Sequence, residues 1–531
     1  MTIKTPQTIY DVLYNTASSV PNYDAYDFMG KSGTYADMLL EIDSCADTLA
    51  EMGIVTDDII SIYLPNMPFA LVLFYAINKI GAISNFIHPL LPVNDHIELL
   101  HEMNPKAVFM LDSFYEKLNE LKSGGLKTKF VLVKTSDYLP VHLKFLYMFK
   151  EINYRKQINF DFDTNYYKQI LGNAKRAPQS LNKTALILFT GGTTGRSKGV
   201  CLSNRNVNLC AAQTKTYQKT SKTQDKMLAI LPVFHGFGLV VCIHTTIMAT
   251  GKVFLLPYYT DKLFKKTIMR KKPNYIIGVP RLYARLTHIL SKTNLNLHFF
   301  KGLYCGGAAL SNSVQEEAAK ILKCHNSPVI IREGYGLTEC VSACTLMPED
   351  EFRQGSVGKP YPGVEIEIRD LSSDQPMKNG KIGEICIKSE TIMNGYFNTD
   401  SPNIKLTNDE KWLYSGDIGY LDDDGFLYFT DRLKRMIKIA GYEVFPTAVE
   451  EIIGSVSGIV NSCVVESSKK GLTYLKAFLV CSLGSDKSAL IELIKSACAE
   501  KLPGYSIPGE FEYLDSIPET LMKKNDYRKL S

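Results

Sequence analysis

The sequence predicts an α/β fold in which a large, multi-layered N-terminal domain carries parallel sheets and a small α+β domain follows it. Short apolar segments alternate with segments of helical spacing along most of the chain, a pattern typical of parallel strands joined by helices. After Asp431 a basic stretch precedes a new series of strands and a helix. The length of 531 residues also exceeds that of one ordinary domain.

The first domain begins with helices and short buried strands. Apolar residues from Leu39 to Met52 recur at helical spacing, and Gly53 stands where such a helix ends. Strands are expected where short apolar runs are bounded by turn residues, at 58–64, 107–111, 130–133, 185–189 and 252–256. Because helical segments separate these strands, they should form parallel sheets.

The second domain is marked by a change in the chain's character. Lys434, Arg435 and Lys438 form a basic stretch, and strands are expected at 463–465 and 477–480 with a helix at 491–499. We place the boundary near residues 432–434. The chain then divides into an N-terminal domain of residues 1–432 and a C-terminal domain of residues 433–531.

Composition excludes several classes of protein. Hydrophobic residues make up 45% and charged residues 22%, and the net charge of +5 is too small to indicate a nucleic-acid partner. The twelve cysteines are scattered without a C-x-x-C pair, which suits a reducing cytoplasm. Residues 1–14 lack a secretory signal, and the longest apolar run, 69–77, is shorter than the roughly 20 residues of a membrane-spanning helix. We expect a cytoplasmic protein.

The segment from Tyr138 to Tyr154 combines aromatic, apolar and basic residues. One interpretation is a surface helix packed on the domain. The other is a helix that touches a membrane, which would make the protein peripheral at that surface.

The most informative segment is Thr190–Gly199, which has the sequence TGGTTGRSKG and follows the apolar strand 185–189. Glycines allow backbone N–H groups to turn toward an anion, and Lys198 adds a positive charge. Such a loop suits the β- and γ-phosphates of a nucleotide. It lacks the G-x-x-x-x-G-K-[ST] spacing of the common phosphate loop.

This loop resembles the signature of the adenylate-forming, or AMP-binding, superfamily, which includes acyl- and aryl-CoA synthetases, luciferase and peptide-synthetase adenylation domains. The resemblance covers nearly the whole chain, because further segments match the superfamily's motifs in order: Asn66 with 81–92, Leu231–His235, Gly306–Ala308, Gly334–Glu339, Tyr414–Asp417, Asp431–Lys434 and Pro518–Leu530. It is greatest with the acyl-CoA synthetase branch, nearest to medium- and long-chain fatty-acid–CoA ligases.

The resemblance implies ATP, Mg²⁺ and coenzyme A as cofactors and assigns nucleotide contacts to matching positions. Glu339 would hold Mg²⁺, because this metal prefers hard oxygen ligands. Thr338 would lie at the α-phosphate, and Asp417 and Arg432 at the ribose. Residues expected around the adenine and the phosphates are Gly307, Ala308, Tyr335, Gly336, Thr190, Gly191, Gly192, Thr193, Thr194, Gly195 and Lys198.

The resemblance also assigns roles in the second domain and beside the acyl group. Lys524 would be the catalytic lysine that stabilises charge as two anions approach. Lys523 replaces the usual glycine before it, so either lysine is a candidate, and the register set by Asp526 favours Lys524. Lys434 would be the hinge between two domain orientations. On the acyl and CoA side the resemblance places His235, Lys438 and Gly441.

The substrate expected is a small-molecule carboxylic acid. No acidic residue follows His235 closely, so a buried ammonium group would lack a partner, and amino acids are disfavoured. Gly236 and Gly238 are expected to leave space for a chain, and the Gly-Gly start of the phosphate loop is a variant seen in long-chain acyl-CoA ligases. We expect a medium- or long-chain fatty acid, with aryl or cinnamate-like acids second. There are two alternatives for the function. One is an acyl-AMP ligase that loads a carrier protein, and the other is a nucleotide sensor without catalysis.

Overall fold

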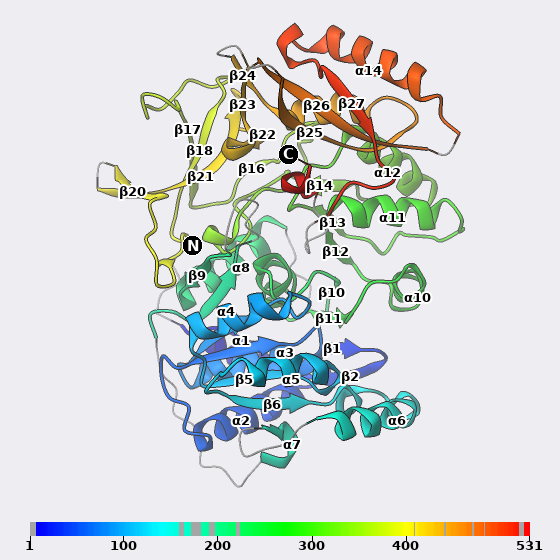
Figure 1. Ribbon diagram of the computed structural model, residues 1–531. Coiled ribbons are helices and arrows are strands. Elements are labelled where there is room, and N and C mark those ends of the chain that lie inside the picture. The colour runs from blue at the N-terminus through cyan, green and yellow to red at the C-terminus, as the bar shows by residue number, and fades with distance from the viewer. Residues whose placement is uncertain are drawn as a thin grey trace.

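The computed structural model describes residues 7–158, 164–170, 182–190, 197–218, 224–407, 409–439, 442–469, 472–482, 484–519 and 525–530. Two mainly parallel sheets, an antiparallel sheet and a small domain with its own sheets follow one another in Figure 1. The α/β fold with parallel sheets and a small second domain is confirmed.

One sheet has seven strands in the order β14-β13-β12-β10-β11-β1-β2. All neighbouring pairs are parallel except β1 with β2. The strands are β1 (Asp24–Phe28), β2 (Lys31–Thr34), β10 (Lys226–Ala229), β11 (Lys252–Leu255), β12 (Tyr275–Gly278), β13 (Gly302–Cys305) and β14 (Ile331–Glu333). Because most of these strands are short, apolar and buried on both faces, they pair as a parallel sheet covered by helices.

The other large sheet has eight strands in the order β19-β9-β8-β4-β3-β5-β6-β7. It is parallel from β8 to β7, whereas β9 and β19 run antiparallel to their neighbours. The strands are β3 (Ile59–Tyr63), β4 (Ile83–Phe86), β5 (Ala107–Leu111), β6 (Lys129–Val133), β7 (Thr164–Tyr166), β8 (Leu186–Phe189), β9 (Gly199–Leu202) and β19 (Gly395–Tyr396). The five strands expected in the first domain are confirmed to within one or two residues.

Helices fill the space between the two sheets and cover their outer faces. One core cluster joins both sheets through α1 (Ile9–Ser19), α2 (Tyr35–Glu51), α3 (Pro68–Lys79) and α8 (Asn204–Tyr217). The outer face of the seven-stranded sheet packs on α10 (Asp261–Lys271), α11 (Pro280–Leu290) and α12 (Asn312–Cys324), and that of the other packs on α4 (Val93–Met103) and α5 (Tyr115–Ser123).

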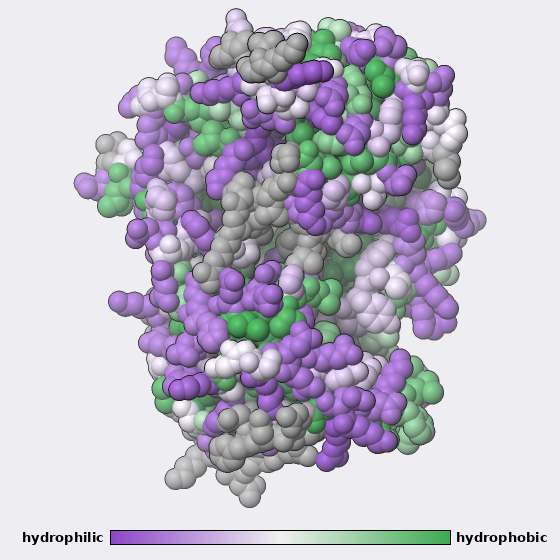
Figure 2. All heavy atoms as spheres, viewed as in Figure 1, coloured by the Kyte–Doolittle hydropathy of each residue, from purple (hydrophilic) through white to green (hydrophobic). Residues whose placement is uncertain are grey.

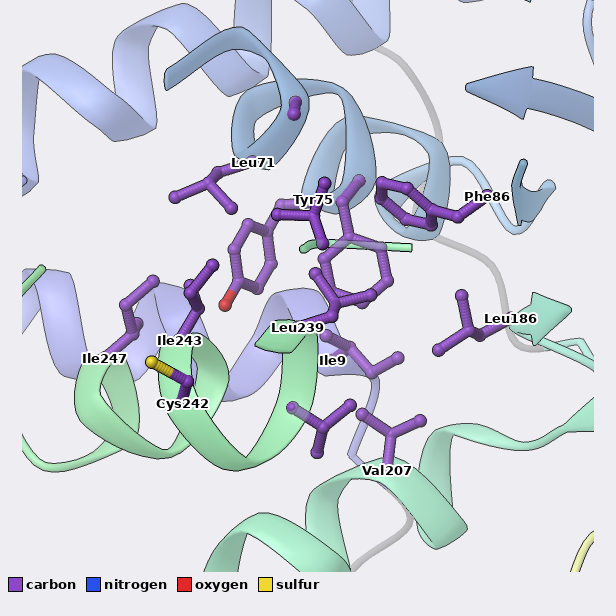
Figure 3. Packing of buried hydrophobic residues seen from close by; sticks show 14 of the residues in the cluster. Ile9, Leu71, Tyr75, Phe86, Leu186, Val207, Leu239, Cys242, Ile243 and Ile247 are labelled. Atoms are coloured by element: carbon purple, nitrogen blue, oxygen red, sulfur yellow. The ribbon is translucent and has the colours of Figure 1, made fainter. Parts of the chain in front are cut away.

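The helix α3 is the centre of the core, which explains its long apolar run. All of its residues are buried, as expected for a helix that is apolar on every side. It packs against a π-helix, η3 (Phe237–His244), and Figure 3 shows the Tyr75 ring of α3 directed toward Ile243 of η3. The Tyr75 hydroxyl lies 2.8 Å from Nδ1 of the buried His244, so these two buried polar groups are paired.

The rest of the chain forms an antiparallel sheet and the small domain. The antiparallel sheet contains β17 (Val364–Arg369), β18 (Gly383–Ser389), β20 (Ile404–Thr407), β21 (Glu410–Leu421) and β22 (Leu427–Arg432). The small domain contains β23 (Ile437–Ile439), β24 (Tyr442–Val444), α13 (Pro446–Gly454), β25 (Ile459–Lys469), β26 (Leu472–Cys481), α14 (Lys487–Lys501) and β27 (Glu510–Tyr513). Its predicted strands and helix are confirmed. The expected boundary at 432–434 falls at the short turn η5 (Leu433–Arg435), and it stays a prediction.

The segment singled out near residue 140 is a helix, α6 (Val141–Gln157), at the edge of the large domain (Figure 1). Glu151 is its one buried residue, and its carboxylate oxygens accept hydrogen bonds from the Ser136 N–H and hydroxyl at 3.1 and 2.7 Å. Beneath the helix lies Asp112, which is fully buried. Burial and then the charge of Glu151 raise the pKa of the Asp112 carboxyl to about 7, from 3.8.

We predict that Asp112→Asn changes the pH dependence of stability. Between about pH 4 and 7 the folded chain holds a proton on Asp112 that the unfolded chain has lost, so the free energy of unfolding falls as pH rises. The variant has no carboxyl group at this position and lacks this fall. Its free energy of unfolding, relative to that of wild type, should therefore rise by about 1–3 kcal/mol from pH 5 to pH 8. Urea unfolding at both pH values measures the difference. The exposed Asp423→Asn is the control, and an equal change in both variants would contradict the assignment.

Candidate active site

The predicted motifs meet at one edge of the seven-stranded sheet. β10, β12, β13 and β14 are parallel, so their carboxyl ends lie side by side. The segments that leave these ends are Leu231–His235, Val279 with Pro280, Gly306–Ala308 and Gly334–Glu339. Ligands of open α/β sheets bind at this edge, where loops rather than strands supply the side chains.

Asn66 joins the two large sheets at this edge. It follows β3 and is buried, and its Nδ2 donates to the carbonyl oxygens of Ala229 and Leu231 at 3.1 and 2.8 Å. Its Oδ1 accepts from the Val233 N–H at 2.9 Å. The Asn66 amide therefore holds the backbone of the Leu231–His235 segment both as a donor and as an acceptor.

Tyr335, Asp417 and Arg432 form the first group of polar side chains. Asp417 and Arg432 are opposite each other on β21 and β22, and Arg432 Nε lies 3.3 Å from Asp417 Oδ1. The Tyr335 hydroxyl donates to Asp417 Oδ2 at 2.8 Å, and burial followed by the Asp417 charge holds the Tyr335 pKa well above its usual value. Asp417 is only 2% exposed, so this carboxylate depends on its partners.

Glu339 and Lys198 form the second group, and Tyr396 connects them. The Tyr396 hydroxyl donates to Glu339 Oε1 at 2.8 Å, and Asn403 Nδ2 donates to the same hydroxyl at 3.2 Å. The ammonium of Lys198 lies 4.5 Å from the centre of the Tyr396 ring, within the range of a cation–π contact. β19 pairs with β9, which begins one residue after Lys198, and this pairing brings the groups together.

The segment after Glu339 is a strained turn. Val341 has φ 68° and ψ −56°, and the Ser342 N–H donates to the Cys340 carbonyl at 2.8 Å. This is a γ-turn of the rare positive-φ kind, and a β-branched residue is unusual in it. Strain of this sort persists only where the surroundings enforce it.

Two glycines, Gly236 and Gly336, lie against this turn, and a third, Gly238, lies against the Leu231–His235 segment. A Cβ on Gly236 would lie 1.9 Å from the Val341 carbonyl oxygen, and one on Gly336 would lie 1.6 Å from that of Ser342. A Cβ on Gly238 would lie 2.2 Å from the Pro232 carbonyl oxygen. The expectation that Gly236 and Gly238 leave space for an acyl chain is therefore wrong. Backbone carbonyls occupy that space, and these glycines allow close packing of the segments around Glu339.

The phosphate loop is described only at its ends. The Thr190 N–H donates to the Lys198 carbonyl at 3.0 Å, and the Lys198 N–H donates to Thr190 Oγ1 at 3.3 Å, so the loop closes at the β8–β9 pair. The predicted phosphate contacts Gly191, Gly192, Thr193, Thr194 and Gly195 lie outside the described residues, as do Lys524 and Gly441.

The remaining predicted residues have the following places. Gly307 and Ala308 are exposed after β13, and Thr338 is half-buried before Glu339. The half-buried His235 packs against Phe234, whose ring centre lies 4.3 Å from that of His88. Lys434 and Lys438 are exposed on η5 and β23, and no described contact joins Lys438 to the two groups above.

The small domain reaches the same edge through the ends of its lysine segment. Glu519 pairs with Asn525 as a β-bridge, and the Asp526 N–H donates to the Pro518 carbonyl at 2.7 Å. Arg281, at the start of α11, donates to Glu519 Oε1 at 2.8 Å. Both ends of segment 520–524 are thus held near the sheet edge.

Sequence reasoning missed Tyr396, Asn403, Arg281 and Glu519 as site residues. The motifs gave no signal for Tyr396 and Arg281, since each contacts a group at least 57 residues away in the chain. Asn66 stood in a matching motif without an assigned role.

Residues 13–397 match the family of AMP-binding enzymes, and residues 448–524 match the AMP-binding enzyme C-terminal domain. The first match spans more than half of the chain, so this protein belongs to the AMP-binding enzyme family. The resemblance to adenylate-forming enzymes is confirmed, and so is the prediction that the chain is an enzyme.

The chain is also similar in sequence to curated CoA ligases and similar in fold to solved structures of CoA ligases and MatB. The chain is 27% identical to a long-chain-fatty-acid–CoA ligase of Bacillus subtilis, covering 99% of this chain and 94% of the relative. It is 27% identical to a probable 4-coumarate–CoA ligase 1 of Dictyostelium discoideum, covering 98% and 94%. The anthranilate–CoA ligase AuaEII with anthranoyl-AMP has a similar fold, with a TM-score of 0.84 at 21% identity over 99% of this chain and 96% of that one. MatB of Rhodopseudomonas palustris with bound ATP gives 0.82 at 21% identity, over 99% and 98%.

We predict that Gly236→Ala destabilises the protein by about 2–3 kcal/mol, because the new methyl group would overlap the Val341 carbonyl and force the turn to move. Gly454→Ala is the matched control. This glycine ends α13 with nothing within 4 Å of its Cβ position, so its substitution should cost nothing. Urea unfolding measures both, and equal stabilities of the two variants would contradict the packing role of Gly236.

Proposed function

We propose that this protein activates a carboxylic acid with ATP, forming an acyl-adenylate and pyrophosphate, and then transfers the acyl group to coenzyme A. The observation that carries the proposal is the pair of polar groups at one sheet edge, Tyr335 with Asp417 and Arg432, and Tyr396 with Glu339 and Lys198. The family and its CoA-ligase relatives support the same reaction.

The first step joins the acid to AMP. A carboxylate oxygen of the acid bonds to the α-phosphorus of ATP while the bond to pyrophosphate breaks. In the second step the thiol sulfur of coenzyme A, having lost its proton, bonds to the acyl carbon while the bond to AMP breaks. Both steps bring anions together, so the chain must supply positive charge and hydrogen-bond donors.

Glu339 is the residue that would hold Mg²⁺. Its carboxylate is a hard oxygen ligand, and the hydrogen bond from Tyr396 fixes its direction. Mg²⁺ would neutralise charge on the phosphate oxygens as pyrophosphate leaves. Lys198 and the donors of the phosphate loop would bind the β- and γ-phosphates, and Thr338 would donate to the α-phosphate.

Asp417 would accept hydrogen bonds from the ribose hydroxyls. Because Arg432 and the Tyr335 hydroxyl already contact this buried carboxylate, it is oriented before the nucleotide arrives. Tyr335 would stack on the adenine, against the backbone of Gly306–Ala308.

The small domain, residues 433–531, would supply Lys524 to the first step. Arg281 and Glu519 favour this proposal, because their ion pair holds the ends of the lysine segment near the site. Rotation about Lys434 would break that pair and turn Lys438 and Gly441 toward the acyl group for the second step. The ion pair is exposed, so it is weak enough to break in each cycle.

The acid is proposed to be a medium- or long-chain fatty acid. No acidic side chain stands near His235 in the Leu231–Leu239 segment to meet a substrate amine, and one relative is named for long-chain fatty acids. Another relative is named for 4-coumarate, so aryl acids are the second candidate. A ligase that transfers the acyl group to a carrier protein, in place of coenzyme A, is the alternative.

The proposed location of the protein is the cytoplasm. Among the described residues, no helix has the length and apolarity needed to cross a membrane.

We predict that Tyr396→Phe raises the Mg²⁺ concentration needed for half-maximal pyrophosphate release by about tenfold, because Glu339 loses a hydrogen bond to a charged acceptor. Tyr474→Phe is the matched control, since Tyr474 also donates to a glutamate, Glu510, at 2.8 Å but in the small domain. Pyrophosphate release over a Mg²⁺ titration measures both variants. An unchanged Mg²⁺ requirement in Tyr396→Phe would remove Glu339 from the proposed metal site.

The proposed reaction is tested by pyrophosphate release with ATP and Mg²⁺, across acids from acetate to palmitate together with benzoate and coumarate. We expect the rate to peak with a fatty acid and to continue through many turnovers only when coenzyme A is present. Release that stops after one turnover with coenzyme A would point to a carrier protein as acceptor. No release with any acid, from folded protein that binds ATP, would contradict catalysis.

A further inference from the structure

The helix α6 presents opposite faces of different character to the domain and to solvent. Leu143, Tyr147, Glu151 and Tyr154 recur at helical spacing and face inward, where Tyr154 stacks on Tyr115 with ring centres 5.8 Å apart. The outward face repeats the same spacing with apolar residues. The inward face therefore anchors the helix and leaves an apolar face in solvent.

The outward face is apolar to a degree that packing does not explain. Its members are Val141, Phe145, Phe149 and Ile152, with exposed fractions of 70%, 64%, 73% and 53%. Leu146 and Met148 extend it on either side and are also exposed. Soluble monomers seldom leave so many neighbouring large apolar side chains in water, and such a patch marks an interaction surface. Figure 2 shows hydrophobic side chains at the lower right edge, where α6 lies in Figure 1.

Positive charges border this face. Lys144 and Arg155 lie along one side of it and Lys150 along the other, whereas Lys156 lies within it, one turn after Ile152. The one acidic residue of the helix, Glu151, is buried and bonded to Ser136. The exposed surface of α6 thus combines large apolar side chains with cations and a few uncharged polar residues, and it carries no exposed acidic group.

We propose that α6 lies in the surface of an anionic lipid bilayer, with its outward apolar face among the acyl chains and its basic border at the headgroups. The charge pattern selects this occupant, because a helix in the membrane interface carries aromatic and aliphatic residues on one side and Lys or Arg beside them. A second copy of the chain would bring the same cations against each other, which opposes self-association through this face. The protein would then be peripheral at the membrane.

This inference goes beyond the proposed reaction and does not depend on it. Asn119 Nδ2 donates to the Gln157 carbonyl at 3.0 Å and Glu151 binds Ser136, so the large domain fixes the helix through contacts that leave its outward face open. No residue of the proposed active site belongs to α6.

The test is flotation of the full chain with vesicles, without any substrate. We expect binding to vesicles of phosphatidylcholine with phosphatidylglycerol, little binding to pure phosphatidylcholine, and release by high salt. The double variant Phe145→Ser and Phe149→Ser should bind at least tenfold more weakly. The triple variant Lys144→Gln, Lys150→Gln and Arg155→Gln should lose about fivefold per cation on anionic vesicles only. The control is Leu406→Ser, an equally exposed apolar residue on β20.

A fluorescence measurement places the helix directly. The chain has one tryptophan, the buried Trp412, so Phe149→Trp adds a reporter on the outward face against a constant background. Its emission should shift to shorter wavelength with anionic vesicles and be quenched by brominated lipids. Vesicle binding that is equal in wild type and the α6 variants, or an unshifted reporter, would overturn the proposal. So would a dimer, detected by light scattering, that the Phe145 and Phe149 variants separate.

Discussion

The site depends on one close contact between backbone segments. The Val341 and Ser342 carbonyl oxygens fill the positions that side chains on Gly236 and Gly336 would occupy, and both close approaches lie at the γ-turn that follows Glu339. The turn is unfavourable by itself, so the packed glycine segments must hold it. As a result, the carboxylate proposed for the metal, the tyrosine proposed for the adenine and the segment carrying His235 belong to one closely packed unit.

Charges at this unit are arranged in pairs that join distant parts of the chain. Asp417 meets Arg432 across a strand pair, and Glu339 meets Lys198 through the side chain of Tyr396. The Asp417 carboxylate is only 2% exposed and would be costly without partners, so its contacts with Tyr335 and Arg432 hold it in place, and the Tyr396 hydroxyl orients the half-buried Glu339. The nucleotide would therefore meet preformed ligands, whereas the Arg281–Glu519 pair lies at the surface and is weak enough to open.

Two helices rich in apolar residues, α3 and α6, differ in how much of their apolar surface the rest of the molecule covers. α3 is apolar on every side and lies at the centre of the core, whereas α6 buries only a narrow face and leaves its largest apolar side chains in water. Both segments are rich in apolar residues, yet their surroundings differ. Neighbouring helices, chiefly α1 and α2, surround α3 between the two sheets, whereas α6 packs on α5 and on the short turns before it with nothing outside it in the described structure.

The sequence by itself determined the fold class and the chemistry. The buried strands were predictable because a short apolar run between turn residues is most readily buried as a strand of a covered sheet. The motifs from Thr190 to Asp431 carry the residue types that bind a nucleotide. Gly236 was recognised but misinterpreted, since a glycine can mean free space or a close backbone contact, and only the neighbouring segment decides which. Tyr396 and Arg281 became site residues through tertiary structure alone, and Asn66 acquired its role only there, because their partners come from other strands and helices. Chemical identity is local to each residue, whereas proximity depends on how the whole chain packs.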